Sequence, residues 1–127
     1  SKEETIELLK RCEEEGLVHV AENKRALGHV ICNCCNDCCI YWPSVRPEMG
    51  IFAGPSRYKA WVDPEECIGC DLCLERCYFD ALHMEADQEL AVVEADYCMG
   101  CGLCQVVCPT DAILMQEARP EEFVPGN

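Results

Sequence analysis

CIGCDLCLERC, at residues 67–77, and CMGCGLCQVVCP, at residues 98–109, are the two stretches that decide the fold of this chain. Each begins with three equally spaced cysteines and adds a fourth after three residues, so that both read CxxCxxCxxxC. In that spacing three thiolates bind one [4Fe-4S] cube and the fourth reaches a second cube. Zinc ribbons usually separate two CxxC pairs. The pattern therefore favours iron–sulfur cubes over the two alternatives, zinc ribbons and a disulfide framework.

An internal repeat relates the two strings. A shift of 31 residues superimposes the four cysteines of the first string on those of the second, and Gly69 on Gly100. The residues that follow correspond as well, Asp80, Ala81, Leu82 and Met84 with Asp111, Ala112, Ile113 and Met115. One departure is Tyr78, which stands where the second string has Pro109. A repeat of this kind predicts a pseudo-twofold domain of the α+β class.

Residues of about 58–118 resemble the bacterial dicluster ferredoxins, on the evidence of these strings and their repeat. The resemblance implies two [4Fe-4S] clusters with crossed ligation. Cys67, Cys70, Cys73 and Cys108 would hold the first cluster, and Cys98, Cys101, Cys104 and Cys77 the second. Because cysteine would saturate every iron, no catalytic residue is expected there.

The resemblance and the residue pattern divide the chain into an N-terminal module (1–57), a ferredoxin domain (58–118) and a C-terminal tail (119–127). Strands are expected in the ferredoxin domain at Tyr58–Val62, Leu82–Glu85, Ala91–Glu94 and Ala112–Gln116. Short helices should follow Cys73 and Cys104. A domain this small buries little apolar surface, so metal ligation should contribute much of its stability.

The N-terminal module is predicted to be a helix followed by a hairpin. Ser1 and Glu4 have capping-box spacing, and Gly16 marks the end of the helix. Strand-like segments occupy residues 17–20 and 29–32. The apolar face of the helix is expected to contain Ile6, Leu8, Leu9 and Cys12, with Cys12 as a buried small hydrophobe.

A third cysteine concentration, CNCCNDCC, follows the hairpin. It contains Cys32, Cys34, Cys35, Cys38 and Cys39. Five thiols in eight residues favour a metal site, in which four of them hold a third [4Fe-4S] cluster or, alternatively, zinc. His19 and His29 could face each other across the hairpin and replace a thiolate, although a structural role is favoured for both and for His83. A CxCCxxCC string before a dicluster ferredoxin resembles the C-terminal part of longer iron–sulfur proteins.

The connection between the cysteine regions is rich in proline, glycine and aromatic residues, which is typical of irregular structure. Its aromatic residues are expected to shield the clusters and fix the N-terminal module in place. They are Tyr41, Trp42, Phe52, Tyr58 and Trp61.

The negative charge of the chain is concentrated in its second half. Residues 63–122 carry fifteen acidic side chains and only two basic ones, Arg76 and Arg119, whereas residues 1–62 are close to neutral. A one-sign field of this kind speeds transient docking, so the expected partner is a redox enzyme or domain with a basic face. Nucleic acid is not expected, because phosphate binding needs clustered Lys and Arg.

These features favour electron transfer to or from a partner redox enzyme or domain. Two alternatives stay open: a reductase subunit with its chemistry at the N-terminal cysteines, and a metal or redox sensor with zinc there. The chain contains no membrane-spanning apolar stretch and no signal-peptide pattern, so a cytoplasmic location without membrane insertion is expected. Serine at position 1 leaves room for a longer natural protein.

Overall fold

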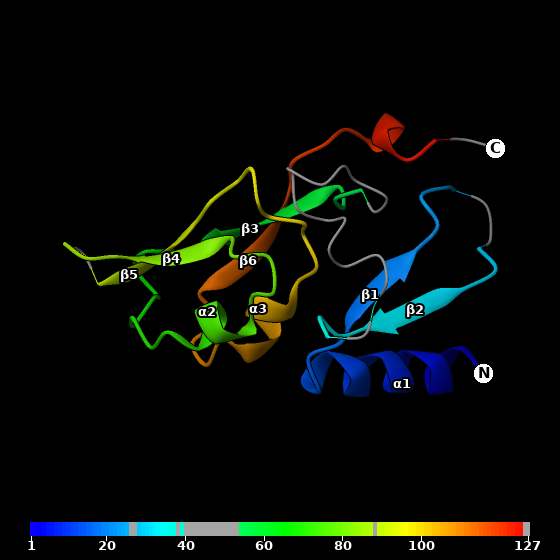
Figure 1. Cartoon of the computed structure of the whole chain (residues 1–127), viewed down its shortest axis with the longest axis horizontal. Helices are drawn as coiled ribbons and strands as arrows, with labels where there is room; N and C mark the ends of the chain where they lie inside the picture. Colours follow the sequence, from blue (N-terminus) through cyan, green and yellow to red (C-terminus); the bar gives the residue numbers. More distant parts are fainter. Residues whose placement is uncertain (26–27, 38, 40–53, 88, 126–127) are drawn as a thin grey trace.

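The computed structural model describes residues 1–25, 28–37, 39, 54–87 and 89–125 (Figure 1). The described part has an α+β fold, as predicted. Its elements in chain order are α1 (Lys2–Glu14), β1 (Val18–Ala21), β2 (Ile31–Cys34), β3 (Tyr58–Val62), α2 (Leu72–Arg76), β4 (Leu82–Glu85), β5 (Leu90–Val93), α3 (Leu103–Val107), β6 (Ile113–Glu117) and the 3-10 helix η3 (Glu121–Phe123). None of its helices is long and apolar enough to cross a membrane.

The strands within this described part pair as three antiparallel ribbons, β1 with β2, β3 with β6, and β4 with β5. The predicted bounds of β3 and β4 are correct, and those of β5 and β6 differ by one residue at each end. Helices α2 and α3 begin one residue before Cys73 and Cys104 rather than after them. Each helix therefore carries the third cysteine of its string in its first turn.

The two halves of the region from β3 to β6 repeat the same hydrogen bonds at the 31-residue offset. The N–H of Asp63 donates to the carbonyl of Ala112, and the N–H of Glu94 donates to the carbonyl of Ala81, both at 2.8 Å. Positive φ angles occur at corresponding positions, in the pairs Gly69 and Gly100, Asp71 and Gly102, and Asp80 and Asp111. The sequence repeat thus has a counterpart in the backbone.

The core of this region is made of small side chains. Its buried members are Ala60, Cys73, Ala81, Ala91, Cys98, Cys104 and Ile113. Leu103, which is 1% exposed, is the largest fully buried side chain among the described residues. Alanine and cysteine remove little apolar surface from water, so apolar burial contributes modestly to stability here. Several of the core positions are candidate cluster ligands.

Helix α1 begins as predicted. The Ser1 hydroxyl accepts a hydrogen bond from the Glu4 N–H in a complete capping box. Within the described structure α1 contacts β1 and α3 (Figure 1). The expected burial of its apolar face was wrong, because Ile6 and Leu8 are 43% and 48% exposed and Cys12 is only half-buried. Two neighbouring elements cover too little of the helix circumference to bury that face.

The hairpin after α1 pairs β1 with β2 in a register that places His19 opposite Asn33. The second strand begins at Ile31, two residues later than predicted. Cys32 and Cys34 therefore lie within β2, where they share one side of the strand.

The C-terminal tail is held against the connection between β1 and β2. Arg25 donates from Nε to the carbonyl of Val124 at 3.1 Å and from Nη2 to the carbonyl of Glu121 at 3.0 Å. The Asn23 amide donates to the carbonyl of Phe123 at 3.4 Å. Residues about a hundred positions apart thus hold the tail and this connection together.

The aromatic residues of the connection do not shield the centre of the domain where they are described. Tyr58 and Trp61 lie on β3 and are 39% and 41% exposed. Trp61 pairs with Leu114 of β6, which is 43% exposed, whereas the neighbouring Ala60 is part of the core. The alternation of strand side chains turns Trp61 outward. Tyr41, Trp42 and Phe52 lie outside the described residues.

Candidate iron–sulfur centres

The first cysteine cavity has an empty volume of about 340 Å³ and lies between α2, β5 and the segment around residues 108–113. Three thiols of the first string line it, those of Cys67, Cys70 and Cys73, together with Cys108 from the second string. The rest of its wall is mostly apolar, formed by Val62, Ile68, Leu72, Ala91, Ala112 and Ile113. Asp71 and Thr110 are its other polar members. Four thiols in a largely apolar wall suit a thiolate-bound cluster.

The second cysteine cavity is of similar size, about 350 Å³. Its thiols are those of Cys98, Cys101 and Cys104 from the second string and Cys77 from the first. Apolar residues again form most of the wall, namely Ala60, Phe79, Ala81, Leu82, Val93, Met99 and Met115. Arg76 is the charged residue in this wall.

The ends of α2 and α3 explain how a thiol reaches the other cavity. Both helices stop at the fourth cysteine of their string, where Cys77 has φ −88° and ψ 107° and Cys108 has φ −71° and ψ 115°. These are extended angles, so the chain leaves the helix in a new direction at each of these residues. The eight thiols thereby divide four and four between the cavities, in the grouping that the resemblance implies.

Glycine is required where each cysteine loop meets a strand of the other half. Gly69 has φ +65°, and a Cβ there would collide with the carbonyl oxygen of Glu89. Gly100 has φ +69°, and a Cβ there would collide with the carbonyl oxygen of Tyr58. The two contacts correspond at the 31-residue offset. Side chains would hold the loops away from the strands and open both cavities.

Burial and crowding raise the pKa of three of these thiols, those of Cys73, Cys101 and Cys104. Burial raises the pKa of Cys73 to about 11, with further increases from the charges of Cys67, Cys70 and Cys108. Burial raises the pKa of Cys104 to about 12, with further increases from Cys101, Cys77 and Cys98. The pKa of Cys101 is raised for the same reasons. Metal must displace protons at these positions, because thiolates are the ligands.

The pKa of the Cys108 thiol shifts in the opposite direction, below its ordinary value. Burial alone would raise its pKa, but hydrogen bonds from the backbone and hydroxyl of Thr110 and from the N–H groups of Ala112 and Ile113 outweigh burial and lower it. Its Sγ lies 3.7 Å from the Thr110 Oγ1. These donors favour the thiolate form that binds iron.

Each cavity is lined by four cysteines, one for each iron of a cube. Among the described residues, no three Cys, His, Asp or Glu side chains converge on one position that could hold a metal ion. A cube needs no such convergence, since each of its four thiolates binds a different iron. None of the eight cysteines that line the two cavities is in a disulfide, so all eight are available as ligands. Four cysteines around each largely apolar cavity therefore fit a [4Fe-4S] cluster.

The N-terminal thiols also lie near one another. Burial is the main cause that raises the pKa of Cys34 to about 11. A hydrogen bond with Cys39 and the charges of Cys39, Cys32 and Cys35 raise this pKa further. The Cys35 thiol donates to the Asp37 carboxylate at 2.6 Å. Cys32, Cys35 and Cys39 are thus close enough to Cys34 to act on it electrostatically, and the fifth predicted ligand, Cys38, lies outside the described residues.

His19 and His29 do not face each other across the hairpin, although the sequence had allowed it, because His19 pairs with Asn33. His19 lies 2.6 Å through Nδ1 from the Asn33 Oδ1 and 3.3 Å through Nε2 from the Glu13 Oε1. His29 precedes β2, is 84% exposed, and lies 3.6 Å from Glu22. The later start of β2 explains the difference. His83 is on the surface, 3.6 Å from Glu94.

Two lining residues were missed by sequence reasoning, Thr110 and Arg76. Thr110 follows Cys108 by two residues, and its hydroxyl beside a ligand could have been a signal. Arg76 directly precedes Cys77 and is one of only two basic residues between positions 63 and 122. An isolated cation beside a ligand in an acidic region was the available sign.

Comparison with known proteins agrees with this geometry. Residues 60–115 match the family model of the 4Fe-4S dicluster domain. A segment of 37 residues, 29% of this chain, is 49% identical to part of a protein of Cryptosporidium parvum named pyruvate dehydrogenase [NADP(+)]. The chain spans about 2% of the length of that relative. The family match supports a ferredoxin-type iron–sulfur protein, and iron–sulfur domains of this type suggest electron transfer.

Proposed function

We propose that this chain carries electrons through two [4Fe-4S] clusters to or from a partner redox enzyme or domain. Cys67, Cys70, Cys73 and Cys108 hold one cluster, and Cys98, Cys101, Cys104 and Cys77 hold the other. The observation that carries the proposal is the division of eight free thiols between two cavities, each with one thiol from the other string. Each cluster, when bound, accepts and donates one electron at a time.

The pseudo-twofold relation of the two halves belongs to this proposal. The corresponding hydrogen bonds of Asp63 and Glu94 support it. Helices α2 and α3 support it as well, because the chain becomes extended at the end of both. Each half contributes a thiol to the cavity of the other, so bound iron joins them covalently. The apolar walls exclude water and help to set the reduction potentials.

The N-terminal thiols are proposed to hold a third [4Fe-4S] cluster. The electrostatic influence of Cys32, Cys35 and Cys39 on Cys34 supports this step. Zinc in the same position is the alternative, and it would favour a structural or sensing role. Quantitation of iron, sulfide and zinc on anaerobically purified protein distinguishes them, because about twelve iron atoms indicate three cubes and about eight indicate two.

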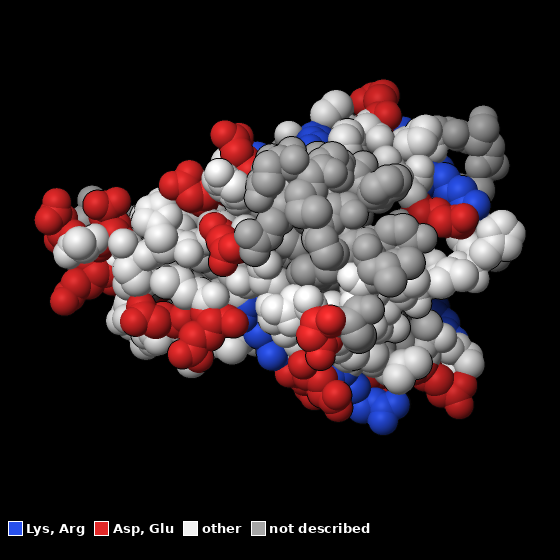
Figure 2. Space-filling view, in the orientation of Figure 1, with Lys and Arg blue, Asp and Glu red and all other residues white. Residues whose placement is uncertain are grey.

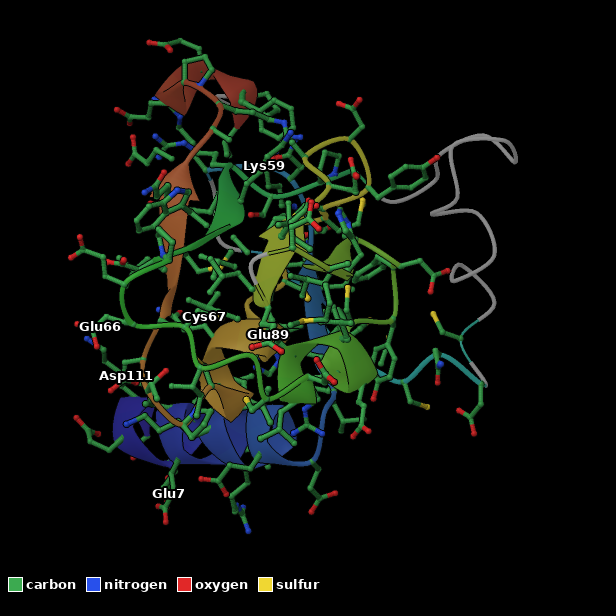
Figure 3. All side chains as sticks on the ribbon, turned by 90° about the vertical axis from the view of Figure 1, so that its left-hand side faces the viewer. Glu7, Lys59, Glu66, Cys67, Glu89 and Asp111 are labelled. Atoms are coloured by element: carbon green, nitrogen blue, oxygen red, sulfur yellow. The ribbon has the colours of Figure 1, made fainter. Side chains whose placement is uncertain are left out.

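Electrons are proposed to enter or leave at the end of the molecule that contains the first cavity. Ile68, in the wall of this cavity, is 66% exposed, and Leu72 is 40% exposed. Acidic side chains gather at this end in Figure 2, and Figure 3 looks onto it with Glu66, Glu89 and Asp111 on the same side as Cys67. A partner with a basic rim and an apolar centre complements such a surface.

The chain is further proposed to act within a longer protein or a complex, as a component of an oxidoreductase system in a reducing compartment such as the cytoplasm. Its similarity to a short segment of a much longer protein supports the first part. The cysteines in metal-ligand spacing support the second, because such thiols bind metal where they stay reduced.

Redox titration followed by electron paramagnetic resonance tests the central proposal. Two or three fully cysteine-ligated clusters that are reduced one electron at a time support electron transfer. A signal that changes on addition of small ligands would instead locate a reaction at an open iron. Protein that contains no iron after anaerobic purification and reconstitution with iron and sulfide would refute the proposal.

A further inference from the structure

Arg76 has a position that ligand binding alone does not explain. It is the last residue of α2 and directly precedes Cys77, and it lines the second cavity beside four thiols. Its Nε is buried and has no hydrogen-bond partner among the described residues. A buried N–H without a partner is costly, so a group that fills this cavity is the natural acceptor.

The other end of the same guanidinium holds helix α1. Nη2 of Arg76 donates to the carbonyl of Glu13 at 3.0 Å and to the carbonyl of Glu14. These carbonyls belong to the last turn of α1, where a cation is favoured by the helix dipole. Gly16 lies next to the guanidinium of Arg76, since a Cβ at Gly16 would be 2.6 Å from its Nη1. The side chain is thus fixed between α1 and the second cavity.

The two cavities differ in the charged residue that each has in its wall. At the 31-residue offset Arg76 corresponds to Val107, which does not line the first cavity. The first cavity has Asp71 in its wall instead, and the corresponding residue of the second cavity is Gly102. A carboxylate disfavours the added negative charge of a reduced cluster, whereas a guanidinium stabilises it.

We propose that Arg76 raises the reduction potential of the cluster in the second cavity by donating its Nε–H to a sulfur there, and that α1 fixes Arg76 for this purpose. The inference rests on the proposed function, since it requires a cluster at each cavity. Hydrogen bonds to cluster sulfurs and nearby positive charge both raise the potential. The second cluster is then the one reduced first, and electrons collect on the side of the molecule that faces α1.

The test compares Arg76→Met with Arg11→Met in the full, cluster-loaded chain. Arg11 lies in the last turn of α1, is exposed, and does not line the second cavity, so it controls for the change in net charge. Potentials are measured by anaerobic redox titration. The contact-shifted cysteine protons in nuclear magnetic resonance assign each potential to a cluster. Arg76→Met is expected to weaken reduction of the second cluster about tenfold, which is 59 mV for one electron, and Arg11→Met to have little effect.

A second pair of variants tests the contribution of α1 without a change of charge. Gly16→Ala introduces a Cβ 2.6 Å from Nη1 of Arg76 and 2.9 Å from the Tyr78 hydroxyl, at a φ of +84°, so the guanidinium must shift. Gly54→Ala, where a Cβ meets nothing within 4 Å, is its control. Gly16→Ala should lower the same potential as Arg76→Met, and Gly54→Ala should not. Arg76→Lys keeps the charge but lacks the Nε–H, so its effect should be intermediate.

Each result decides the question. Equal potentials in wild type, Arg76→Met and Gly16→Ala, or equal shifts of both clusters, would overturn the inference while the clusters themselves stand. If Arg76→Met does not retain iron, Arg76→Lys and Gly16→Ala decide by the same criterion. Absence of iron from the wild-type chain would refute the proposed function instead.

Discussion

Cys77 and Cys101 line the same cavity although they belong to different cysteine strings. Cys77 also acts on Cys101 electrostatically. Burial is the main cause of the raised pKa of the Cys101 thiol, and the charge of Cys77 raises it further. Cys108, which belongs to the second string, likewise lines the first cavity. The proposed clusters therefore join sequence segments that are distant along the chain, and loss of one thiol has a defined consequence.

Cys77→Ala should remove the cluster held by the second string and leave the other in place. Iron content should fall by about four atoms per chain, because one cube contains four irons. Cys12→Ala is the control, since Cys12 lines neither cavity. Iron analysis together with assignment of the remaining cysteine resonances checks the prediction. Loss of the cluster bound by Cys67 and Cys70 would contradict the crossed arrangement.

The ferredoxin part could be predicted closely from sequence because local signals and the repeat agree there. The bounds of β3 and β4 followed from strand patterns that flank the first cysteine string. The register of the N-terminal hairpin could not, since its long connection gives no turn signal to fix the pairing of His19 with Asn33. The contact of Arg76 with α1 joins residues distant in sequence, and no local pattern reports such a contact.

The repeat predicts equivalent roles for Leu72 and Leu103, but their surroundings differ. Leu103 is 1% exposed on α3, the helix that α1 contacts, whereas Leu72 is 40% exposed on α2. Leu103→Ala should therefore destabilise the loaded protein by about 2–4 kcal/mol, and Leu72→Ala by less than about 1 kcal/mol. Thermal melts of both variants in the same buffer measure the difference. Equal melting midpoints for the two variants would show that the contact with α1 does not make Leu103 more important for stability than Leu72.

Acid should release the clusters and unfold the domain. Burial raises the pKa of Cys104 to about 12 and of Cys73 to about 11, so these thiols hold their protons strongly when iron is absent. Iron binding displaces those protons, and its free energy weakens as the pH falls. Visible absorbance of the clusters should decline from pH 8 to pH 5. The circular dichroism of the backbone should follow, because the apolar core is small. Cluster retention that does not vary over this range would contradict the prediction.

The N-terminal site should depend on Cys34, whose thiol has Cys32, Cys35 and Cys39 as electrostatic neighbours. Cys34→Ala is expected to abolish metal binding there while the two ferredoxin clusters remain. Iron content should fall by about four atoms if the site holds a cube, or zinc by about one if it holds zinc. Cys12→Ala serves again as the cysteine control. Unchanged metal content in Cys34→Ala would show that this residue is not a ligand.

The surface around the first cavity should govern the rate of electron exchange. Glu66 and Glu89 are exposed at that end of the molecule, and Glu7 lies on α1 away from them (Figure 3). Reversal of charge by Glu66→Lys should slow electron transfer to a basic c-type cytochrome on the order of twofold to tenfold at low salt, and raised salt should remove the difference. Glu7→Lys makes the same change in net charge and should have a much smaller effect. Stopped-flow kinetics across a salt series measure both. Equal slowing by the two variants would show that overall charge, rather than this end of the protein, directs docking.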